Sequence, residues 1–235
     1  MDFKPNIEQQ QLSDAVREFG SSLNEGMVER DRNETFSRDN WRKCAEFGIL
    51  GLPVPTQYGG SGQDLTTTIL AMEALGYSCR DNGLVFALNA QMWAVEHPLI
   101  RFGNDRQKSH YLPLLCNGEI IGAHAVTEPE YGSDAMSMKT RYKKDGDHYI
   151  LNGSKTFITN GPEANLVLAF ATLDPTLRSS GLSAFLIETG TPGMMLSRPI
   201  QKMGLRTSPM GEVVFQDCKV PIENRLGNEG QGVMI

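Results

Sequence analysis

Residues 117–134 read "NGEIIGAHAVTEPEYGSD" and separate two halves of the chain whose apolar residues repeat with different periods. Before Gly118, apolar residues recur at the three- and four-residue spacing of an amphipathic α-helix. After it, "IIGAHAVT" is a short apolar run that ends in polar residues, as a buried strand does. We therefore predict an α+β multidomain protein, with an all-α domain over residues 1–118 and a β-barrel or β-sandwich domain over residues 119–226.

Two stripes of apolar residues predict helices at the start and the end of the first half. They consist of Leu12, Val16, Phe19 and Leu23, and of Leu84, Leu88, Met92, Val95 and Leu99. Each stripe covers one face of a helix that can pack on a core. Pro98 interrupts the second stripe, and we expect it to kink or end that helix, because proline lacks the N–H that a helix interior needs.

Side chains that can cap a helix precede three further helical segments: Ser37, Asp64 and Asn104. Asn104 is followed three residues later by Gln107, which resembles a capping box. Gly48 is expected to end the helix that begins after Ser37. The helix after Asp64 is expected to bury Leu65, Ile69 and Met72.

Alternating polar and apolar residues predict strands in the second half. The run "MKTRYKKDGDHYIL" contains two alternating segments around Asp145-Gly146, which is a strong hairpin signal. The runs "LVLAFATL", "LSAFLIE" and "GEVVFQDCKV" follow at strand-like lengths, separated by Gly, Pro and Ser. Several short strands at this spacing favour a small barrel or sandwich.

Residues 227–235 are expected to begin a C-terminal helical domain that the chain truncates. The segment "RLGNEGQGVMI" places an apolar triplet directly after a glycine-rich turn, as at the start of a helix. Chains usually end in exposed polar residues. We therefore expect the sequence to be a fragment of a longer protein.

Composition and charge argue against several classes of protein. The formal net charge is -6 and no basic run is present, so a nucleic-acid partner is not expected. No stretch approaches the roughly 18 apolar residues that a membrane span requires. The segment "MDFKPNIEQQQLSDAVREF" is neither a secretory signal nor an Arg-rich transit sequence, which indicates a cytoplasmic location.

The cysteines and histidines are scattered and form no metal-binding motif. The four cysteines contain no CxxC pair, and without a signal peptide we expect reduced thiols. No HExxH motif or Cys/His cluster is present, so no metal site is expected. The histidines other than His124 are interpreted as surface or structural residues.

Two glycine clusters and one serine invite interpretations that their surroundings do not support. "YGGSG" and "GNEGQG" lack the Lys-Ser/Thr that follows the glycines of a phosphate-binding loop, and no strand precedes them as in a dinucleotide fingerprint. Ser133 lacks the GxSxG context of a hydrolase nucleophile. Flexible connections and an ordinary turn explain these residues better.

Two polar segments that each follow a strand are the best candidates for a site. In "AVTEPEYGSD" an apolar strand ends at Thr127, and the turn from Pro129 to Gly132 brings Ser133 back. In "KTFITNG" the period of two places Phe157 and Thr159 on one face of a strand. An aromatic ring, hydroxyls and backbone donors suit a flat heterocycle or a phosphate. The alternative interpretation is that both segments are strand ends with ordinary turn chemistry.

The same segments resemble the acyl-CoA dehydrogenase family. "AVTEPEYGSDAMS" is similar to the family signature, and "LNGSKTFITNG" resembles its second flavin segment. "KMGLRTSP", "EVVFQDCKVP" and "RLGNEGQG" follow in the family's order, and "FGILGLPVPTQYGG" corresponds in the helical half. The resemblance covers essentially all 235 residues.

The resemblance implies a FAD-dependent enzyme that oxidises the Cα–Cβ bond of an acyl thioester to the enoyl thioester, in fatty acid metabolism. The substrate would be an acyl-CoA or an acyl-carrier protein, since "GYSCRDNGLVFALNAQMWA" is reminiscent of relatives that act on carrier-bound acyl groups. It also implies an electron-transferring flavoprotein as a possible electron acceptor and a homo-oligomer at full length. A flavin-dependent oxidase or monooxygenase, or a non-catalytic truncated relative, remain open as alternatives.

By similarity, the FAD contacts are expected in two stretches of the second half: His124, Ala125, Val126, Thr127, Gly132 and Ser133, and Phe157, Ile158 and Thr159. Ser133 would also face the pantetheine arm of the substrate. The family often has Trp in place of Phe157 and Tyr or Phe in place of His124. No residue here matches the family's catalytic base, which is expected beyond Ile235. Part of the flavin-binding surface would be absent with the same C-terminal domain, so we expect the chain alone to bind FAD weakly and to turn over poorly or not at all.

Overall fold

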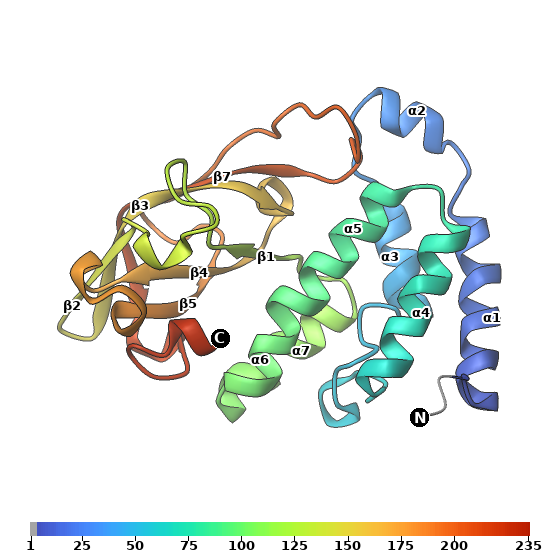
Figure 1. Cartoon of the computed structure of the whole chain (residues 1–235), viewed down its shortest axis with the longest axis horizontal. Coiled ribbons are helices and arrows are strands. Elements are labelled where there is room, and N and C mark those ends of the chain that lie inside the picture. The colour runs from blue at the N-terminus through green and yellow to red at the C-terminus, as the bar shows by residue number, and fades with distance from the viewer. Residues whose placement is uncertain (1–3) are drawn as a thin grey trace.

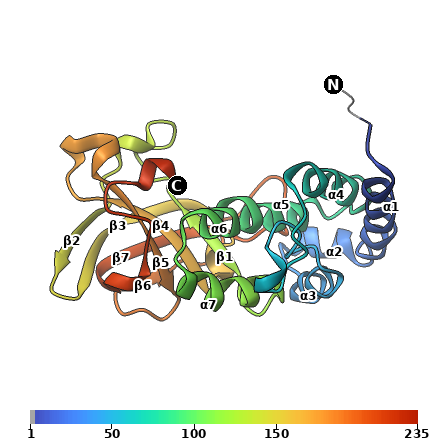
Figure 2. The same cartoon turned by 90° about the horizontal axis from the view of Figure 1, so that it is seen from below.

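The computed structural model describes residues 4–235 as a helical half and a strand half that lie side by side (Figure 1). The helices are α1 (Ile7–Ser22), α2 (Met27–Arg32), α3 (Arg38–Phe47), α4 (Leu65–Ser78), α5 (Asn82–Gln91), α6 (His97–Phe102) and α7 (Asp105–Cys116). The strands are β1 (Gly122–Ala125), β2 (Arg141–Asp145), β3 (His148–Thr159), β4 (Leu166–Thr172), β5 (Leu182–Glu188), β6 (Met194–Leu196), β7 (Met210–Pro221) and β8 (Arg225–Leu226). Seen from below, α1 lies at the end of the molecule farthest from the sheet, and α6 and α7 lie next to the strands (Figure 2).

The predicted helix starts are confirmed by hydrogen bonds from the first turns. Ser37 accepts from the Asn40 N–H at 3.2 Å, and Asp64 accepts from the Thr67 N–H at 2.7 Å. Asn104 and Gln107 form the reciprocal capping box. These side chains satisfy N–H groups that have no partner within the helix.

The buried face of α4 differs from the prediction. Met72 is buried, but Leu65 and Ile69 are 58% and 50% exposed. The side of α4 that packs on the core instead consists of Thr67, Thr68, Ala71, Met72, Ala74 and Leu75. The helix is apolar on nearly all sides, so its sequence does not indicate which face is buried.

The second apolar stripe is buried throughout, and Pro98 neither ends the helix nor leaves it regular. A π-helical turn, η2 (Met92–Glu96), joins α5 to α6, and Pro98 lies in the first turn of α6. Because the backbone is helical on both sides of Pro98, its missing N–H interrupts the hydrogen-bond ladder, and the wider π turn lies directly before this interruption. The π turn adds one residue and inserts Glu96 into the interior, where its side chain is fully buried.

The strands form one 8-stranded sheet in the order β6-β7-β3-β2-β4-β5-β8, with β1 beside β4. The predicted hairpin at Asp145-Gly146 joins β2 to β3. The strand-rich half is confirmed, but a closed barrel is wrong, because the order runs from β6 to β8 without returning. At its middle, β2 and β4 pair only between Arg141 and Thr172, so the sheet divides there into two arms. Both arms contribute to one core cluster, to which β2, β4 and β7 supply Tyr142, Val167 and Phe215.

Strand β4 is buried on both faces and connects the two halves of the molecule. Val167, Ala169 and Ala171 face the core between the arms of the sheet. Leu166, Leu168 and Phe170 face the opposite way and pack with residues of α6 and α7. Strand β1 pairs in parallel with this buried strand, and its last residue, Ala125, lies opposite Ala169. The position of β4 therefore determines where β1 ends.

A long loop before β7 returns to the helical half, as the orange segment reaching α2 shows in Figure 1. The Arg206 guanidinium donates to the carbonyls of Asp31 and Arg32 at 3.0 and 3.2 Å and pairs with Glu34 at 2.7 Å. The Thr207 hydroxyl donates to the buried Asp81 carboxylate at 2.5 Å. The loop therefore joins the strand half to the start of α5.

All four cysteines are buried and free of disulfide bonds. Within residues 4–235, no helix combines the length and the apolar character required to cross a membrane.

Candidate functional site

The two polar segments singled out in the sequence lie next to each other. The chain leaves β1 at Ala125, and the Thr156 N–H of β3 donates to the Thr127 carbonyl at 2.9 Å. Two strand ends that are about 30 residues apart in sequence thus form one continuous edge. We call residues 125–127 the first tip and residues 157–159 the second tip.

The second tip presents an aromatic ring to the outside. The pairing of β3 with β7 shifts register between Lys155 and Ile158, which makes a bulge at Phe157. Phe157 has φ +57° and is 60% exposed, whereas Ile158 is buried. A left-handed backbone at an exposed phenylalanine costs about 1–3 kcal/mol and persists only where the surrounding structure imposes it. The bulge therefore directs a large apolar side chain away from the core, as a surface that receives a flat ligand requires.

The hydroxyls at the tips are free to bind a ligand. Thr127 and Thr159 are partly exposed, and no group of the described residues hydrogen-bonds to either hydroxyl. Ile158 is buried between the exposed Phe157 and the partly exposed Thr159, and the bulge interrupts the regular alternation of β3 at Phe157. An exposed ring flanked by two unpaired hydroxyls fits a planar heterocycle with polar edges.

A buried ion pair lies beneath the tips. Lys155 is 0% exposed, and its Nζ donates to the Glu128 carboxylate at 2.8 Å and to the Val126 carbonyl at 3.0 Å. Glu128 also accepts from the N–H groups of Lys139 and Thr140 at 2.6 and 2.9 Å. Burial disfavours the Glu128 carboxylate, but attraction to Lys155 and these hydrogen bonds hold its pKa below its ordinary value. Glu128 therefore fixes the turn and is not available as a general base.

His124 of β1 lies on the opposite face from Ala123 and Ala125. Its ring packs edge-on against Phe170, with the ring centroids 5.1 Å apart. Burial, together with the positive charge of Lys155, lowers the pKa of His124 to about 4. The imidazole is therefore neutral at pH 7 and can donate one hydrogen bond and accept one.

Gly132 and Ser133 are exposed and do not contact the second tip through any hydrogen bond of the described residues. A Cβ at Gly132 would meet no atom within 4 Å, so the surface there is open. The next residue, Asp134, pairs with Arg178 at 3.2 Å. The structure thus brings the two tips together and leaves residues 132–133 on an open loop beside Asp134.

Asn160 connects the second tip to the helical half. Its side-chain Nδ2 donates to the carbonyls of Ala87 and Gly122 at 3.0 and 3.1 Å, and its backbone has φ 65°. Its Oδ1 is buried without a partner among the described residues. One side chain thus joins α5, the start of β1 and the end of β3.

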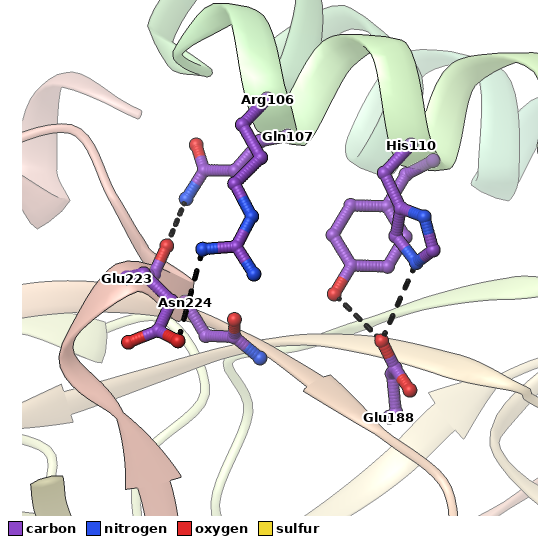
Figure 3. A pocket seen from close by; sticks show the side chains of 7 residues that line it. Arg106, Gln107, His110, Glu188, Glu223 and Asn224 are labelled. Atoms are coloured by element: carbon purple, nitrogen blue, oxygen red, sulfur yellow. Dashed lines mark hydrogen bonds and ion pairs between the residues drawn. The ribbon is translucent and has the colours of Figure 1, made fainter.

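A separate hollow of ≈ 200 Å³ lies between α7 and the sheet and contains none of the predicted site residues (Figure 3). The Gln107 amide donates to the Glu223 carbonyl at 2.8 Å, and the Tyr111 hydroxyl donates to Glu188 at 2.9 Å. His110 lies 3.7 Å from the same carboxylate. These contacts join the lining residues to one another, and they connect α7 of the helical half to the strand half.

Two domain models of one family match this chain. The model described as "Acyl-CoA dehydrogenase, N-terminal domain" matches residues 6–119, and "Acyl-CoA dehydrogenase, middle domain" matches residues 123–218. The chain belongs to the acyl-CoA dehydrogenase family. The resemblance of the ordered motifs is thereby confirmed.

Relatives within the acyl-CoA dehydrogenase family differ in the acyl carrier that their names specify. The chain is 41% identical to "Isovaleryl-CoA dehydrogenase, mitochondrial" of Pongo abelii, over 97% of the chain and 55% of that protein. It is 42% identical to "L-prolyl-[peptidyl-carrier protein] dehydrogenase" of Pseudomonas fluorescens, over 86% of the chain and 53% of that protein. The chain therefore spans little more than half the length of these curated relatives.

Solved structures of the family match the whole fold. "Prolyl Acyl Carrier Protein Oxidase AnaB" superposes with a TM-score of 0.96 at 50% identity, covering 98% of this chain and 61% of that chain. "PigA with FAD and proline" superposes with a TM-score of 0.95 at 39% identity, covering 99% of this chain and 61% of that chain.

Sequence reasoning missed Lys155 and Asn160, which hold the tips in place. A lysine within a strand is usually expected at the surface, and nothing local indicates that its partner lies 27 residues earlier. Asn160 gave a weak signal, since asparagine before glycine is typical of a left-handed turn.

Proposed function

We propose that this chain forms the helical and middle domains of a FAD-dependent enzyme that dehydrogenates an acyl thioester to the enoyl thioester. The observation that carries the proposal is the adjacency of the two tips, with Phe157 exposed between free hydroxyls. The names of the relatives, and the FAD bound in the PigA structure, support the same conclusion.

In this proposal the two tips bind and orient the flavin. Phe157 packs beside the ring system, and the hydroxyl of Thr159 donates near its central ring. The backbone of Ala125, Val126 and Thr127 meets the pyrimidine edge, and Ile158 supports the second tip from below. A bound flavin supplies hydride acceptance, which no protein side chain can perform.

The remaining candidates act around the tips. His124, neutral at pH 7, offers one hydrogen bond to the flavin or its side chain. The open surface at Gly132 allows a close approach of the cofactor, and Ser133 faces the pantetheine arm of the substrate. The proton is removed by a base outside these residues, since Glu128 is ionised but fully occupied by its partners.

We further propose a carrier-bound acyl group as the substrate, with an acyl-CoA as the alternative. The names of the Pseudomonas fluorescens relative and of AnaB both specify a carrier protein. The experiment is to mix the protein at its natural length with FAD, and then with prolyl-carrier protein or with an acyl-CoA, without oxygen. Bleaching of the flavin by the carrier-bound substrate alone supports the proposal. Bleaching by neither thioester contradicts the dehydrogenase proposal.

A flavin oxidase is a second candidate, because AnaB is named an oxidase. In an oxidase, oxygen reoxidises the flavin and peroxide is released, whereas a dehydrogenase passes electrons to an acceptor such as an electron-transferring flavoprotein. Peroxide release under air at the rate of substrate consumption would favour the oxidase. Turnover that requires ferricenium or the flavoprotein would favour the dehydrogenase.

A cytoplasmic location and a homo-oligomeric assembly are also parts of the proposal. Four buried cysteines without disulfide bonds are compatible with the first, and the family resemblance supports the second. Fractionation of the cells and light scattering of the purified protein test them separately.

A further inference from the structure

We infer that Lys155, supported by Glu128, is a positioning residue that aims the Val126–Thr127 peptide group at the flavin. This inference rests on the proposed function, because it assigns Lys155 a role toward the cofactor that the two tips would bind. Lys155 itself is fully buried and touches no ligand surface. It acts through the backbone of the first tip.

Lys155 lies next to the second tip in sequence and hydrogen-bonds to the first tip through its side chain. Lys155 belongs to β3, directly before the bulge that exposes Phe157. Its Nζ binds the Val126 carbonyl of the first tip at 3.0 Å and the Glu128 carboxylate at 2.8 Å, and it lies 3.6 Å from the Met138 sulfur. One ammonium group therefore links the second tip to the carbonyl of the first.

The bond to Val126 determines the direction of the next N–H. In a trans peptide the carbonyl and the following N–H point in opposite directions. Because Lys155 draws the Val126 carbonyl inward, the Thr127 N–H points away from the interior. The Thr127 carbonyl is held separately by the Thr156 N–H at 2.9 Å, so the peptide groups on both sides of Thr127 are fixed. A donor held in this way needs no reorganisation when a ligand binds.

Stability alone does not account for this ion pair. Taking both charges out of water is expensive, and apolar side chains of similar volume often serve a fold as well or better. The Glu128 oxygens are already engaged by two backbone N–H groups and by Lys155, so Glu128 anchors the ammonium at a defined point. What an apolar pair could not supply is the hydrogen bond to the Val126 carbonyl.

The test compares two variants of the protein at its natural length that both lose the ion pair. Glu128→Gln keeps the Lys155 bond to the Val126 carbonyl, whereas the double variant Lys155→Met/Glu128→Gln removes it. The matched control is Arg38→Met/Glu163→Gln, which removes an exposed pair of 2.6 Å elsewhere in the chain. The readouts are the FAD dissociation constant, the visible absorption bands of bound FAD, the urea midpoint, and the Thr127 amide NMR resonance without FAD.

The double variant is expected to bind FAD about tenfold or more weakly, as the loss of one well-aligned hydrogen bond predicts. Its bound-flavin spectrum should shift toward that of free FAD, and its Thr127 amide resonance should move even without FAD. The Arg38→Met/Glu163→Gln control should keep the wild-type spectrum and an affinity within about threefold. Glu128→Gln should fall between the control and the double variant, because the Val126 bond survives but its ammonium loses one anchor.

Two results would overturn the inference while leaving the proposed function intact. One is a folded double variant with the affinity and spectrum of the wild type. The other, decisive even if the double variant does not fold, is a folded Glu128→Gln protein whose Thr127 amide resonance moves while its FAD affinity and spectrum stay those of the wild type. Failure of the wild type itself to bind FAD would instead refute the proposed function, and the inference with it.

Discussion

Glu128 and Glu96 are both buried carboxyl groups, but one lies beneath the tips and the other in the π turn between α5 and α6. Glu128 has an ammonium and two backbone N–H groups as partners. Glu96 has one, the Gln91 amide at 2.8 Å, and its second oxygen is buried without a partner among the described residues. The number of partners decides which of the two carries a charge.

The pKa values move in opposite directions for this reason. The partners of Glu128 outweigh burial and lower its pKa, whereas burial raises the pKa of Glu96 to about 8, opposed only by Gln91. At pH 7 Glu128 is ionised and Glu96 is protonated. The buried carboxyl group at the candidate site is thus charged and holds backbone N–H groups in place. The buried carboxyl group in the π turn between α5 and α6 is neutral.

The largest loss of stability is expected when one partner of the Lys155–Glu128 ion pair is removed and the other remains. Lys155→Met leaves Glu128 buried and unpaired, so the free energy of unfolding should fall by about 3–5 kcal/mol. Urea unfolding at pH 7 measures this loss. The exposed Arg38→Met control should lose no more than about 1 kcal/mol. Equal losses in the two variants would contradict the distinction between the buried pair and a surface pair.

The second-largest loss of stability is expected when the side chain of Asn160, which connects the second tip to α5, is removed. Asn160→Ala leaves the buried carbonyls of Ala87 and Gly122 without their donor and keeps a left-handed backbone, at a cost of about 3 kcal/mol. Asn160→Gly allows the same backbone and should lose about 1 kcal/mol less. Urea midpoints of both variants test this, and a loss below about 0.5 kcal/mol in Asn160→Ala would show that the hydrogen bonds matter little.

Protonation of Glu96 should make stability depend on pH. The raised pKa means that the folded state holds a proton which the unfolded state releases above about pH 4.5. This contribution is complete below pH 4.5 and is lost as the pH rises toward 8. Between pH 6 and pH 8 this contribution should therefore fall by on the order of 2 kcal/mol. The low pKa of His124 makes stability rise over part of the same interval, so the fall is measured as the difference between the wild type and a variant without the Glu96 carboxyl group.

The matched variant for that measurement is Glu96→Gln, which cannot ionise. Its unfolding free energy should be flatter over the same pH interval, and it should equal or exceed that of the wild type at pH 8. A difference in unfolding free energy between the wild type and Glu96→Gln that stays constant from pH 6 to pH 8 would be inconsistent with a protonated Glu96.

The smallest effect on stability is expected at the exposed ring of the second tip. Phe157→Gly relieves the left-handed strain and adds chain entropy, so the free energy of unfolding should change by less than about 1 kcal/mol. Binding of FAD should nevertheless weaken, because the ring surface is lost. Calorimetry and flavin titration on the same samples separate the two effects. A loss of several kcal/mol without any change in FAD binding would mean that Phe157 serves the fold instead.

Features set by neighbours in sequence could be predicted, and those set by distant partners could not. The caps at Ser37, Asp64 and Asn104 depend on residues three positions away, and the Asp145-Gly146 hairpin depends on its own turn. The two strand ends of the candidate site could be recognised for the same reason. The division of the sheet into two arms, which the single Arg141–Thr172 pair joins, depends on contacts between distant strands.

Burial of polar residues was the main source of error and omission. Lys155 in a strand and Glu96 in an apolar stripe look like surface residues until their tertiary neighbours are known. In α4, small residues pack on the core while Leu65 and Ile69 remain outside. Hydrophobicity alone therefore located the elements but did not indicate which side chains support the site.

The most direct measurement is a crystal structure of the protein at its natural length with FAD bound. The account predicts that the ring system lies against Phe157, with its pyrimidine edge on Val126 and Thr127 and with the Lys155–Glu128 pair unchanged beneath. A flavin bound away from both tips, or tips that separate when it binds, would contradict the account.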